Sequence, residues 1–349
     1  MIITAITFTS QGEEKLRSLM ELTPDILWQQ KPEGVDGKAW TMECFQKHLP
    51  MLFVGATGIA VRYISPFVED KLCDSPVLVM DEKGQFLIPI LSGHMGGANA
   101  IACRLAKASG AVPVITTATD VEKVFSVDSF ARINGLRIVQ REGIRKVSEL
   151  ALSGKSISLW IDPEIELPKE PMPEGLYLVE KAEDYADVRI CLEERQETTS
   201  NCLITLIPRL YCVGMGCKRG KSFEDINSFA TMILDGVLWK ETVARSMERE
   251  IYAFATIDLK LKELGLQTFA QYYKAPLYTY SAEELKAQQG SFSQSAFVEQ
   301  TTGVSNVCER SAMACAGAGA SLVIKRTACD GMTIAVAKRR PRITSWACR

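Results

Sequence analysis

The stretch Leu-Ser-Gly-His-Met-Gly-Gly-Ala-Asn at residues 91–99 decides how the first part of the chain folds. It follows the apolar run Phe86–Leu91, which is typical of a buried strand. It leads into Ala98–Ser109, which has a helix-forming composition and stops at Gly110. The pattern therefore predicts a strand, a glycine-rich turn and a helix.

The glycines of this turn favour a ligand site. Gly93, Gly96 and Gly97 can take a positive φ and let the backbone approach a ligand closely. A turn from a strand into a helix also directs backbone N–H groups and the positive end of the helix dipole at an anion. The alternative is a tight turn in which His94 only packs.

Two further loops follow the same plan. Residues 55–58 come after the apolar run at 51–54, and residues 214–220 come after the run at 210–213. In open α/β sheets such loops lie at the carboxyl ends of strands, where ligands bind. The cations beside the last loop are expected anion contacts: Lys218, Arg219 and Lys221. No loop has the glycine spacing of a dinucleotide or nucleoside triphosphate site, which disfavours both ligands.

Composition limits the classes of partner. The 349 residues are 47% hydrophobic and 23% charged, with a net charge of −2, so nothing favours nucleic acid or an anionic membrane as partner. No apolar run reaches the ~20 residues of a membrane-spanning helix. The first residues lack the basic region of a signal peptide, so we expect a cytoplasmic protein.

Metal and disulfide frameworks are also disfavoured. The 11 cysteines include no Cys-x-x-Cys pair, which indicates reduced and mostly buried thiols. Only two histidines are present, His48 and His94. We therefore expect no metal site in the protein itself.

The alternation of strands and helices predicts an α/β protein of several domains, with open, mostly parallel or mixed sheets flanked by helices. We divide the chain into an amino-terminal α/β domain at 1–130, a small middle α/β domain at 131–208 and a carboxy-terminal α/β domain at 209–349. In the first domain, Val77–Met80 and Phe86–Leu91 predict a hairpin or an edge pair, and Val112–Thr116 predicts a further strand.

Local signals give finer expectations. Ser10 with Glu13 indicates a capping box, and Ser222 and Ser305 are expected helix N-caps. Asp258 is read either as the cap of a helix over 259–264 or as a polar site residue. Residues 338–340, Lys-Arg-Arg, are expected to be exposed and disordered.

Taken together, the motifs resemble the cobalt-precorrin-5A hydrolase family of the anaerobic cobalamin pathway. The resemblance rests on five stretches in the family's order: 54–62, 91–99, 213–220, 257–260 and 303–305. It implies three parts, of which the last also resembles a stand-alone protein of the aerobic pathway. It implies opening of the δ-lactone of cobalt-precorrin-5A and release of acetaldehyde, giving cobalt-precorrin-5B.

The implied substrate is a flat cobalt-corrinoid rimmed with carboxylates. Cobalt arrives in the substrate, so no separate cofactor is expected. A homodimer is one oligomeric state that we consider. The residues expected to bind the substrate are Gly55, Thr57, Gly58, Arg62, Gly93, Gly96, Gly97, Asn99, Gly214, Gly216, Cys217, Lys218, Arg219, Asp258 and Lys325.

Lactone hydrolysis requires an activated water and donors for the oxyanion. We expect His94 to act as general base or acid, because histidine titrates near neutrality. Backbone N–H groups near Gly96 and Gly97, with Ser92 or Asn99, are the expected oxyanion donors. A nucleophilic Cys217 with a pKa lowered by neighbouring cations is the alternative chemistry. A tetrapyrrole-binding protein without catalysis is the alternative function.

Overall fold

The computed structural model describes residues 1–70, 73–94, 96–194, 201–237 and 250–347. It divides into two compact units, Met1–Val124 and a second that begins at Phe125. Its three sheets each take their strands from one of the three predicted segments. The boundaries of those segments stay a prediction. No helix among the described residues is long and apolar enough to cross a bilayer.

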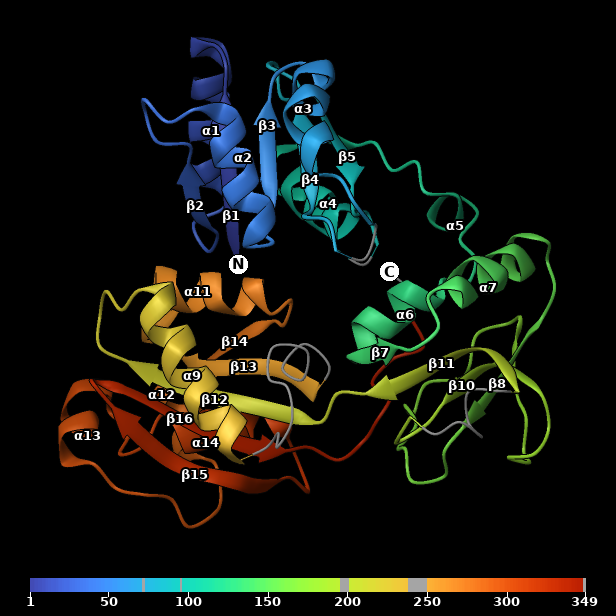
Figure 1. Ribbon diagram of the computed structural model, residues 1–349, viewed down its shortest axis with the longest axis vertical. Helices are drawn as coiled ribbons and strands as arrows, with labels where there is room; N and C mark the ends of the chain where they lie inside the picture. Colours follow the sequence, from blue (N-terminus) through green and yellow to red (C-terminus); the bar gives the residue numbers. More distant parts are fainter. Residues whose placement is uncertain (71–72, 95, 195–200, 238–249, 348–349) are drawn as a thin grey trace. The chain divides into compact units, whose positions relative to one another are not determined.

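The first unit is a six-stranded sheet between two helical layers (Figure 1). The strand order is β2-β1-β3-β4-β5-β6, and all pairs are parallel except the antiparallel pair β4/β5. The strands span β1 Ile2–Thr7, β2 Leu27–Gln30, β3 Met51–Val54, β4 Val77–Met80, β5 Phe86–Leu91 and β6 Val112–Pro113. The predicted mostly parallel or mixed sheet and the 77–91 hairpin are therefore confirmed.

Alternate side chains of these strands feed two separate cores. Ile3 and Ala5 of β1 pack with α1 (Ser10–Leu22) and α4 (Ala98–Ser109). Ile2 and Ile6 point to the opposite face, where α2 (Gly37–Gln46) and the helix α3 (Thr57–Ile64) pack. Because successive strand residues face opposite sides, one short buried strand can serve both layers.

Among the local predictions for this unit, the helix at 98–109 is confirmed, and two others are corrected. Helix α4 begins and ends as predicted, with Gly110 in the left-handed conformation at φ 76°. The predicted capping box at Ser10 is wrong, because Thr9 is the cap and its hydroxyl accepts from Gly12 N. The predicted strand at 112–116 is shortened to the two residues of β6.

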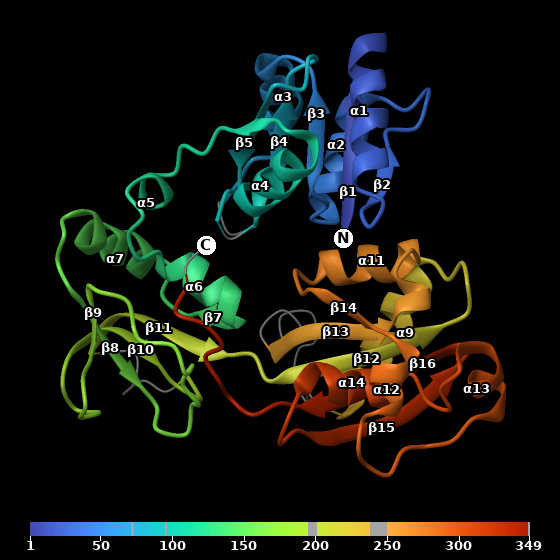
Figure 2. The same ribbon diagram turned by 180° about the vertical axis from the view of Figure 1, so that it is seen from behind.

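The second unit contains two five-stranded sheets, seen from behind in Figure 2. One has the order β7-β11-β10-β8-β9, and α6 (Val127–Asn134) and α7 (Glu142–Leu152) belong to this region. Its strands are β7 Leu136–Ile138, β8 Ile157–Ile161, β9 Leu176–Leu178, β10 Ala186–Ile190 and β11 Cys202–Pro208. Only the edge strand β7 is antiparallel to its neighbour.

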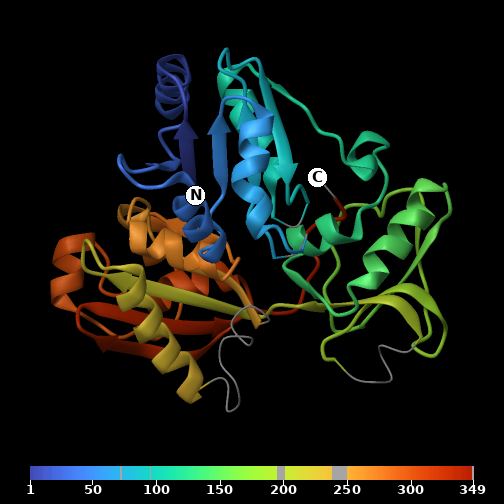
Figure 3. The same cartoon turned by 45° about the horizontal axis from the view of Figure 1, so that its top comes forward.

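The other sheet has the order β14-β13-β12-β16-β15 and is covered on both faces. Helices α9 (Phe223–Val237) and α11 (Leu264–Tyr272) pack on one face, where α9 lies along the sheet in Figures 1 and 3, and α14 (Cys308–Ala316) packs on the other. The strands are β12 Tyr211–Cys217, β13 Ile251–Ile257, β14 Leu277–Tyr280, β15 Ser321–Cys329 and β16 Met332–Lys338. The shorter helices are α5 Ala118–Val121, α12 Ala282–Lys286 and α13 Ala296–Thr302.

Helix ends in this unit correct two predictions and confirm one. Ser222 is the expected cap, since its hydroxyl accepts from Asp225 N at 3.0 Å. Before α14, however, the amide oxygen of Asn306 accepts from Glu309 N, so the cap predicted at Ser305 is wrong. Asp258 opens the 3₁₀ turn Asp258–Lys260, and α11 begins only at Leu264, so the helix predicted over 259–264 is wrong.

The segment after β16 is not a disordered tail. Arg339 is only 3% exposed, and the chain runs on to α6, as the red segment in Figures 1 and 2 shows. There Asn134 bonds to Thr344 and Ser345, and Trp346 stacks on Phe130 with the ring centroids 6.1 Å apart. The segment therefore ties the two sheets of this unit together.

The first half of the loop predicted at 214–220 is part of a strand. β12 continues to Cys217 and pairs with β16 along its whole length. Gly214 lies where α14 crosses the sheet, and a Cβ there would be 1.8 Å from the carbonyl oxygen of Cys308. The missing side chain thus permits close packing of helix on sheet, as glycine does where two backbones approach.

We therefore expect Gly214→Ala to lower the free energy of unfolding by about 3 kcal/mol or more, since the added methyl overlaps backbone atoms that cannot move independently. Urea denaturation of the two proteins measures the difference. Gly216→Ala is the matched control on the same strand, because its Cβ would meet only the hydroxyl of Thr333. Equal losses in the two variants would contradict the packing role of Gly214.

Candidate active site

The turn at residues 92–99 is closed by its own backbone hydrogen bonds. Ala98 N donates to Ser92 O at 3.1 Å, and Asn99 N donates to Gly93 O at 3.0 Å. Ser92 and Gly97 both adopt positive φ, at 54° and 85°. These hydrogen bonds hold the turn in a compact form and fix the backbone from which the side chain of His94 extends.

Two glycines of this turn are needed because a side chain would not fit at their positions. A Cβ at Gly96 would lie 2.5 Å from Cβ of Ser92, and one at Gly93 would lie 2.8 Å from the amide oxygen of Asn99. The glycines were expected to let the backbone approach a ligand. In the structure, the close neighbours of Gly93 and Gly96 are instead other residues of the same turn. No conclusion about a ligand follows from the glycines alone.

His94 forms a hydrogen bond with a carboxylate. Its Nε2 lies 2.7 Å from Oδ2 of Asp120, and the side chains of the two residues are 11% and 22% exposed. The amide nitrogen of Asn99 donates to the same Oδ2 at 2.7 Å and to Oγ1 of Thr117 at 3.0 Å. The half-buried cluster of His94, Asp120, Asn99 and Thr117 is the candidate active site.

Asp120 was absent from the residues expected at this site. It lies on the short helix α5, which follows β6 along the chain. β5 and β6 are parallel neighbours, so residues after both strands lie at the same edge of the sheet. That rule is the signal that could have found Asp120, once the run at 112–116 was taken as the neighbour of 86–91.

The pairing defines what the imidazole can do. A carboxylate only accepts hydrogen bonds, so Asp120 accepts the Nε2 proton of His94 and leaves Nδ1 as the basic nitrogen. The same arrangement orients histidine bases and stabilises the imidazolium in hydrolases. Asn99 fixes Asp120 in turn, so the cluster is suited to general acid–base chemistry.

Three of the other donors expected in this turn are already engaged. The hydroxyl of Ser92 donates to the carbonyl of Asp74 at 2.8 Å and is buried. Gly97 N donates to His94 O at 3.1 Å, and the amide of Asn99 serves Asp120 and Thr117. The expectation that the Gly97 N–H group and Asn99 bind an oxyanion therefore conflicts with the observed hydrogen bonds.

The loop at 55–58 lies at the opposite edge of the sheet. β5 runs antiparallel to β4 and therefore also to β3, so its carboxyl end lies where β3 begins. Gly55 and Thr57 follow the end of β3, and Gly58 lies in the first turn of α3. The loop at 55–58 and His94 therefore lie at opposite edges of this sheet, because the hairpin reverses the chain.

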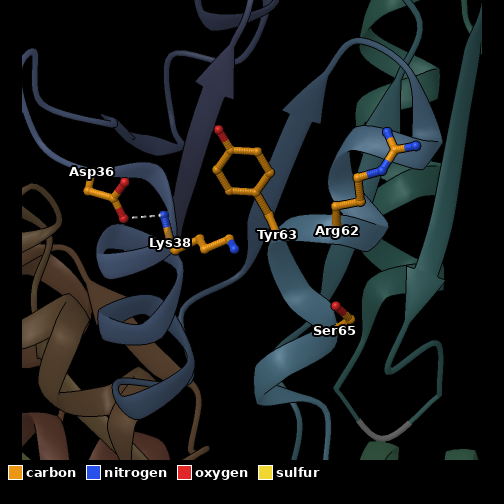
Figure 4. Close-up of a pocket in the computed structure, with 5 residues that line it drawn as sticks. All are labelled: Asp36, Lys38, Arg62, Tyr63 and Ser65. Carbon is orange, nitrogen blue, oxygen red and sulfur yellow. Dashed lines mark hydrogen bonds between the residues drawn. The ribbon is translucent and has the colours of Figure 1, made fainter.

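Arg62 of α3 belongs to a surface pocket of about 510 Å³. Figure 4 shows its five lining side chains, with Lys38 and Tyr63 in the space between α2 and α3 and Arg62 directed to the other side of α3. Asp36 is held by the N–H groups at the start of α2. The remaining lining residue is Ser65. The pocket offers cations and hydroxyl groups to an anionic ligand.

The carboxyl ends of β12 and β13 bring another predicted set together. The two strands are parallel, so Cys217, Lys218 and Arg219 share an edge with Asp258. Lys218, Arg219 and Asp258 are exposed, whereas Lys221 is paired with Asp330 at 2.5 Å. Lys325 is exposed midway along β15, away from this edge. Gly214 and Gly216 lie within the strand and not in the loop.

The environment of Cys217 does not favour a nucleophile. Burial raises the pKa of its thiol to about 11, and Lys260 only partly offsets this effect. The expected lowering of the pKa by neighbouring cations is thus contradicted. Among the described residues no group of three or more His, Cys, Asp or Glu side chains is placed to hold a metal ion.

We expect Cys217 to react slowly with iodoacetamide at pH 7, because only the thiolate reacts and the raised pKa keeps the thiol protonated. Its rate should climb through pH 9 to 11 as the thiolate forms. Peptide mapping by mass spectrometry follows each cysteine separately, with the exposed Cys103 and Cys329 as internal controls. Labelling of Cys217 at pH 7 faster than that of both controls would restore the nucleophile hypothesis.

Comparison with known proteins agrees with these motifs. Residues 39–120 match the family model described as "Cobalamin synthesis G N-terminal", and residues 211–337 match "Cobalamin synthesis G C-terminus". A cobalt-precorrin-5A hydrolase of Salmonella typhimurium is 34% identical over 272 residues, covering 76% of this chain and 75% of that protein. The enzyme of the same name from Priestia megaterium is 29% identical, covering 95% and 93%.

Solved structures from cobalamin biosynthesis also align. The structure of a cobalamin biosynthesis protein G homologue from Sulfolobus solfataricus aligns over 96% of this chain and 96% of its own, at 21% identity and with a TM-score of 0.42. CobE aligns with 38% of this chain and 92% of its own at 32% identity, with a TM-score of 0.33. On the evidence of both family models and the Salmonella relative, this chain belongs to the cobalamin synthesis G family, whose curated relatives are named cobalt-precorrin-5A hydrolase.

Proposed function

We propose that this chain hydrolyses cobalt-precorrin-5A, opening its δ-lactone and releasing the two-carbon fragment as acetaldehyde to give cobalt-precorrin-5B. Membership of a family with curated hydrolases of this name supports the proposal. The cobalt is part of the substrate, so the protein need not supply a metal of its own. The expected cytoplasmic location and the homodimer stay predictions.

The hydrogen bond between His94 and Asp120 carries the chemical part of the proposal. In it, Nδ1 of His94 takes a proton from the water that attacks the lactone carbonyl, and the imidazolium formed is stabilised by Asp120. Collapse of the tetrahedral intermediate opens the lactone, and the released alkoxide becomes the carbonyl of acetaldehyde as the carbon–carbon bond breaks. The imidazolium returns its proton to the carbon of the macrocycle that carried the two-carbon fragment. Asp120 and Asn99 act as positioning residues.

Ser92 has no catalytic part in this scheme. A hydroxyl has one proton to donate, and that of Ser92 is given to the carbonyl of Asp74 inside the protein. Removing the hydroxyl of Ser92 would leave the buried carbonyl of Asp74 without this hydrogen bond. We therefore assign Ser92 to the stability of the turn, in place of the role in catalysis expected from the sequence.

Binding of the carboxylate rim requires cations that are exposed. In the first unit we propose Arg62 and Lys38, which line its surface pocket, as contacts for carboxylates of the substrate. In the second unit we propose Lys218 and Arg219, at the carboxyl end of β12, as exposed contacts for a carboxylate ligand. Charge-assisted hydrogen bonds of this kind suit carboxylate ligands. Gly214 is excluded from this role, because it is covered by α14.

We expect His94→Ala to lower the rate of acetaldehyde release by about 100-fold or more, which is the usual contribution of a general base. Asp120→Asn should also lower it by about 100-fold or more, because asparagine neither stabilises the imidazolium nor keeps the proton on Nε2. Acetaldehyde formed from cobalt-precorrin-5A is the measurement, and the visible spectrum of the corrinoid reports binding.

The matched control is His48→Asn, which removes the other histidine and suits its positive φ of 51°. It should keep the activity of the unchanged protein. Binding with acetaldehyde release at the full rate in His94→Ala would exclude the base. Binding by the unchanged protein without any acetaldehyde would instead indicate a tetrapyrrole carrier.

A further inference from the structure

A buried arginine in the second unit has two unsatisfied donors. Arg339 follows β16, is 3% exposed, and its guanidinium lies 3.7 Å from the ring centroid of Tyr252. Its Nε and Nη2 have no hydrogen-bond partner among the described residues. These two nitrogens form one edge of the guanidinium, which is the edge that binds a carboxylate or phosphate through two parallel hydrogen bonds.

Two other arginines of this unit have comparable surroundings, and the Nε of each is likewise buried without a partner among the described residues. Arg189 and Arg310 also lie over aromatic rings, at 4.9 and 4.6 Å from the centroids. Each is in addition anchored by backbone carbonyls: those of Ala182 and Asp184 for Arg189, and those of Leu285, Lys286 and Gln288 for Arg310. No such carbonyl pairs with Nε or Nη2 of Arg339. The aromatic contact and the unpaired Nε are therefore shared, and Arg339 differs because its Nη2 is also buried without a partner among the described residues.

The backbone is shaped around this side chain. The register of β12 and β13 passes from Tyr211↔Ile251 to Cys212↔Ala253, so Tyr252 is the extra residue of a β-bulge. Bulges of this kind redirect a side chain and are frequent beside binding sites. Gly135, which ends α6 at φ 63°, leaves room for the ring, since a Cβ there would lie 2.4 Å from Tyr252.

Within the described part of the chain, no carboxylate is among the groups that act on Arg339. Burial lowers the pKa of Arg339, and the other contributors are Tyr252, Cys212, Arg342 and Cys315. The hydrogen bond with Cys315, together with burial, raises the pKa of Cys212, so this thiol is neutral at pH 7. Arg342 is a second cation, and its Nε is likewise buried and without a partner among the described residues. Arginine stays protonated in proteins, so two like charges meet here.

We propose that Arg339 and Arg342 bind a small oxyanion, a carboxylate or a phosphate, where the segment after β16 passes from one sheet of the second unit to the other. The anion takes the free edge of Arg339 and neutralises both guanidinium groups. It also satisfies donors whose burial is otherwise costly. Since all these residues lie in the second unit, the proposal is separate from the chemistry at His94.

The test uses the full chain, dialysed into a buffer whose only anion is a bulky sulfonate, at constant ionic strength. Acetate and inorganic phosphate are then titrated separately while the midpoint of thermal unfolding, Tm, is measured. We expect a saturable rise in Tm of a few degrees, because a ligand that binds only the folded protein stabilises it. The probe that saturates at the lower concentration identifies the class of anion.

Variants assign the effect to the site. Arg339→Gln should abolish the saturable rise, whereas the control Arg310→Gln should lower Tm in every buffer and retain the rise. If Arg339→Gln does not fold, Arg342→Gln provides the test and should move saturation at least several-fold higher in concentration. A Tm of the unchanged protein that does not depend on either probe, or an equal rise in Arg339→Gln, would overturn the proposal.

Discussion

The antiparallel pairing of β5 with β4 is the constraint on which the candidate active site depends. All other neighbouring strands of the first sheet are parallel, so this reversal alone sends the end of β5 to the edge where β3 and β4 begin. Because β6 then pairs parallel to β5, the residues after both strands meet, and His94 reaches Asp120. In a wholly parallel sheet, His94 would lie at the same edge as the loop at 55–58.

The second unit depends on close contact of backbones. Gly214 lets α14 approach β12, and the buried face around Cys212 and Ala312 follows from that contact. The segment after β16 then leaves this sheet and attaches to α6 through Asn134 and Trp346. The same course of the chain buries Arg339 beside Tyr252, so the candidate anion site is a consequence of how the two sheets are joined.

Much of the fold could be predicted because periodicity and caps are local signals. Strands β3, β4 and β5 and helix α4 occur at the predicted residues, and Ser222 caps α9 as expected. The errors arose where a distant segment decided the outcome. Gly214 and Gly216 resemble a loop by composition, but pairing with β16 keeps them in a strand. Lys338–Arg340 resemble an exposed tail by charge, but aromatic stacking and the attachment to α6 bury Arg339.

The sequence by itself determined the α/β class, the positions of most elements, the family and the choice of the turn around His94 as a candidate site. These follow from short patterns of apolar, glycine and capping residues, each of which acts over a few positions of the chain. Only the tertiary structure decided that Asp120 pairs with His94, that Ser92 is held by Asp74, and that Arg339 is buried with an unsatisfied edge. The physical reason is that hydrogen bonding and burial of a side chain are set by neighbours in space, and strand order and direction bring those neighbours together.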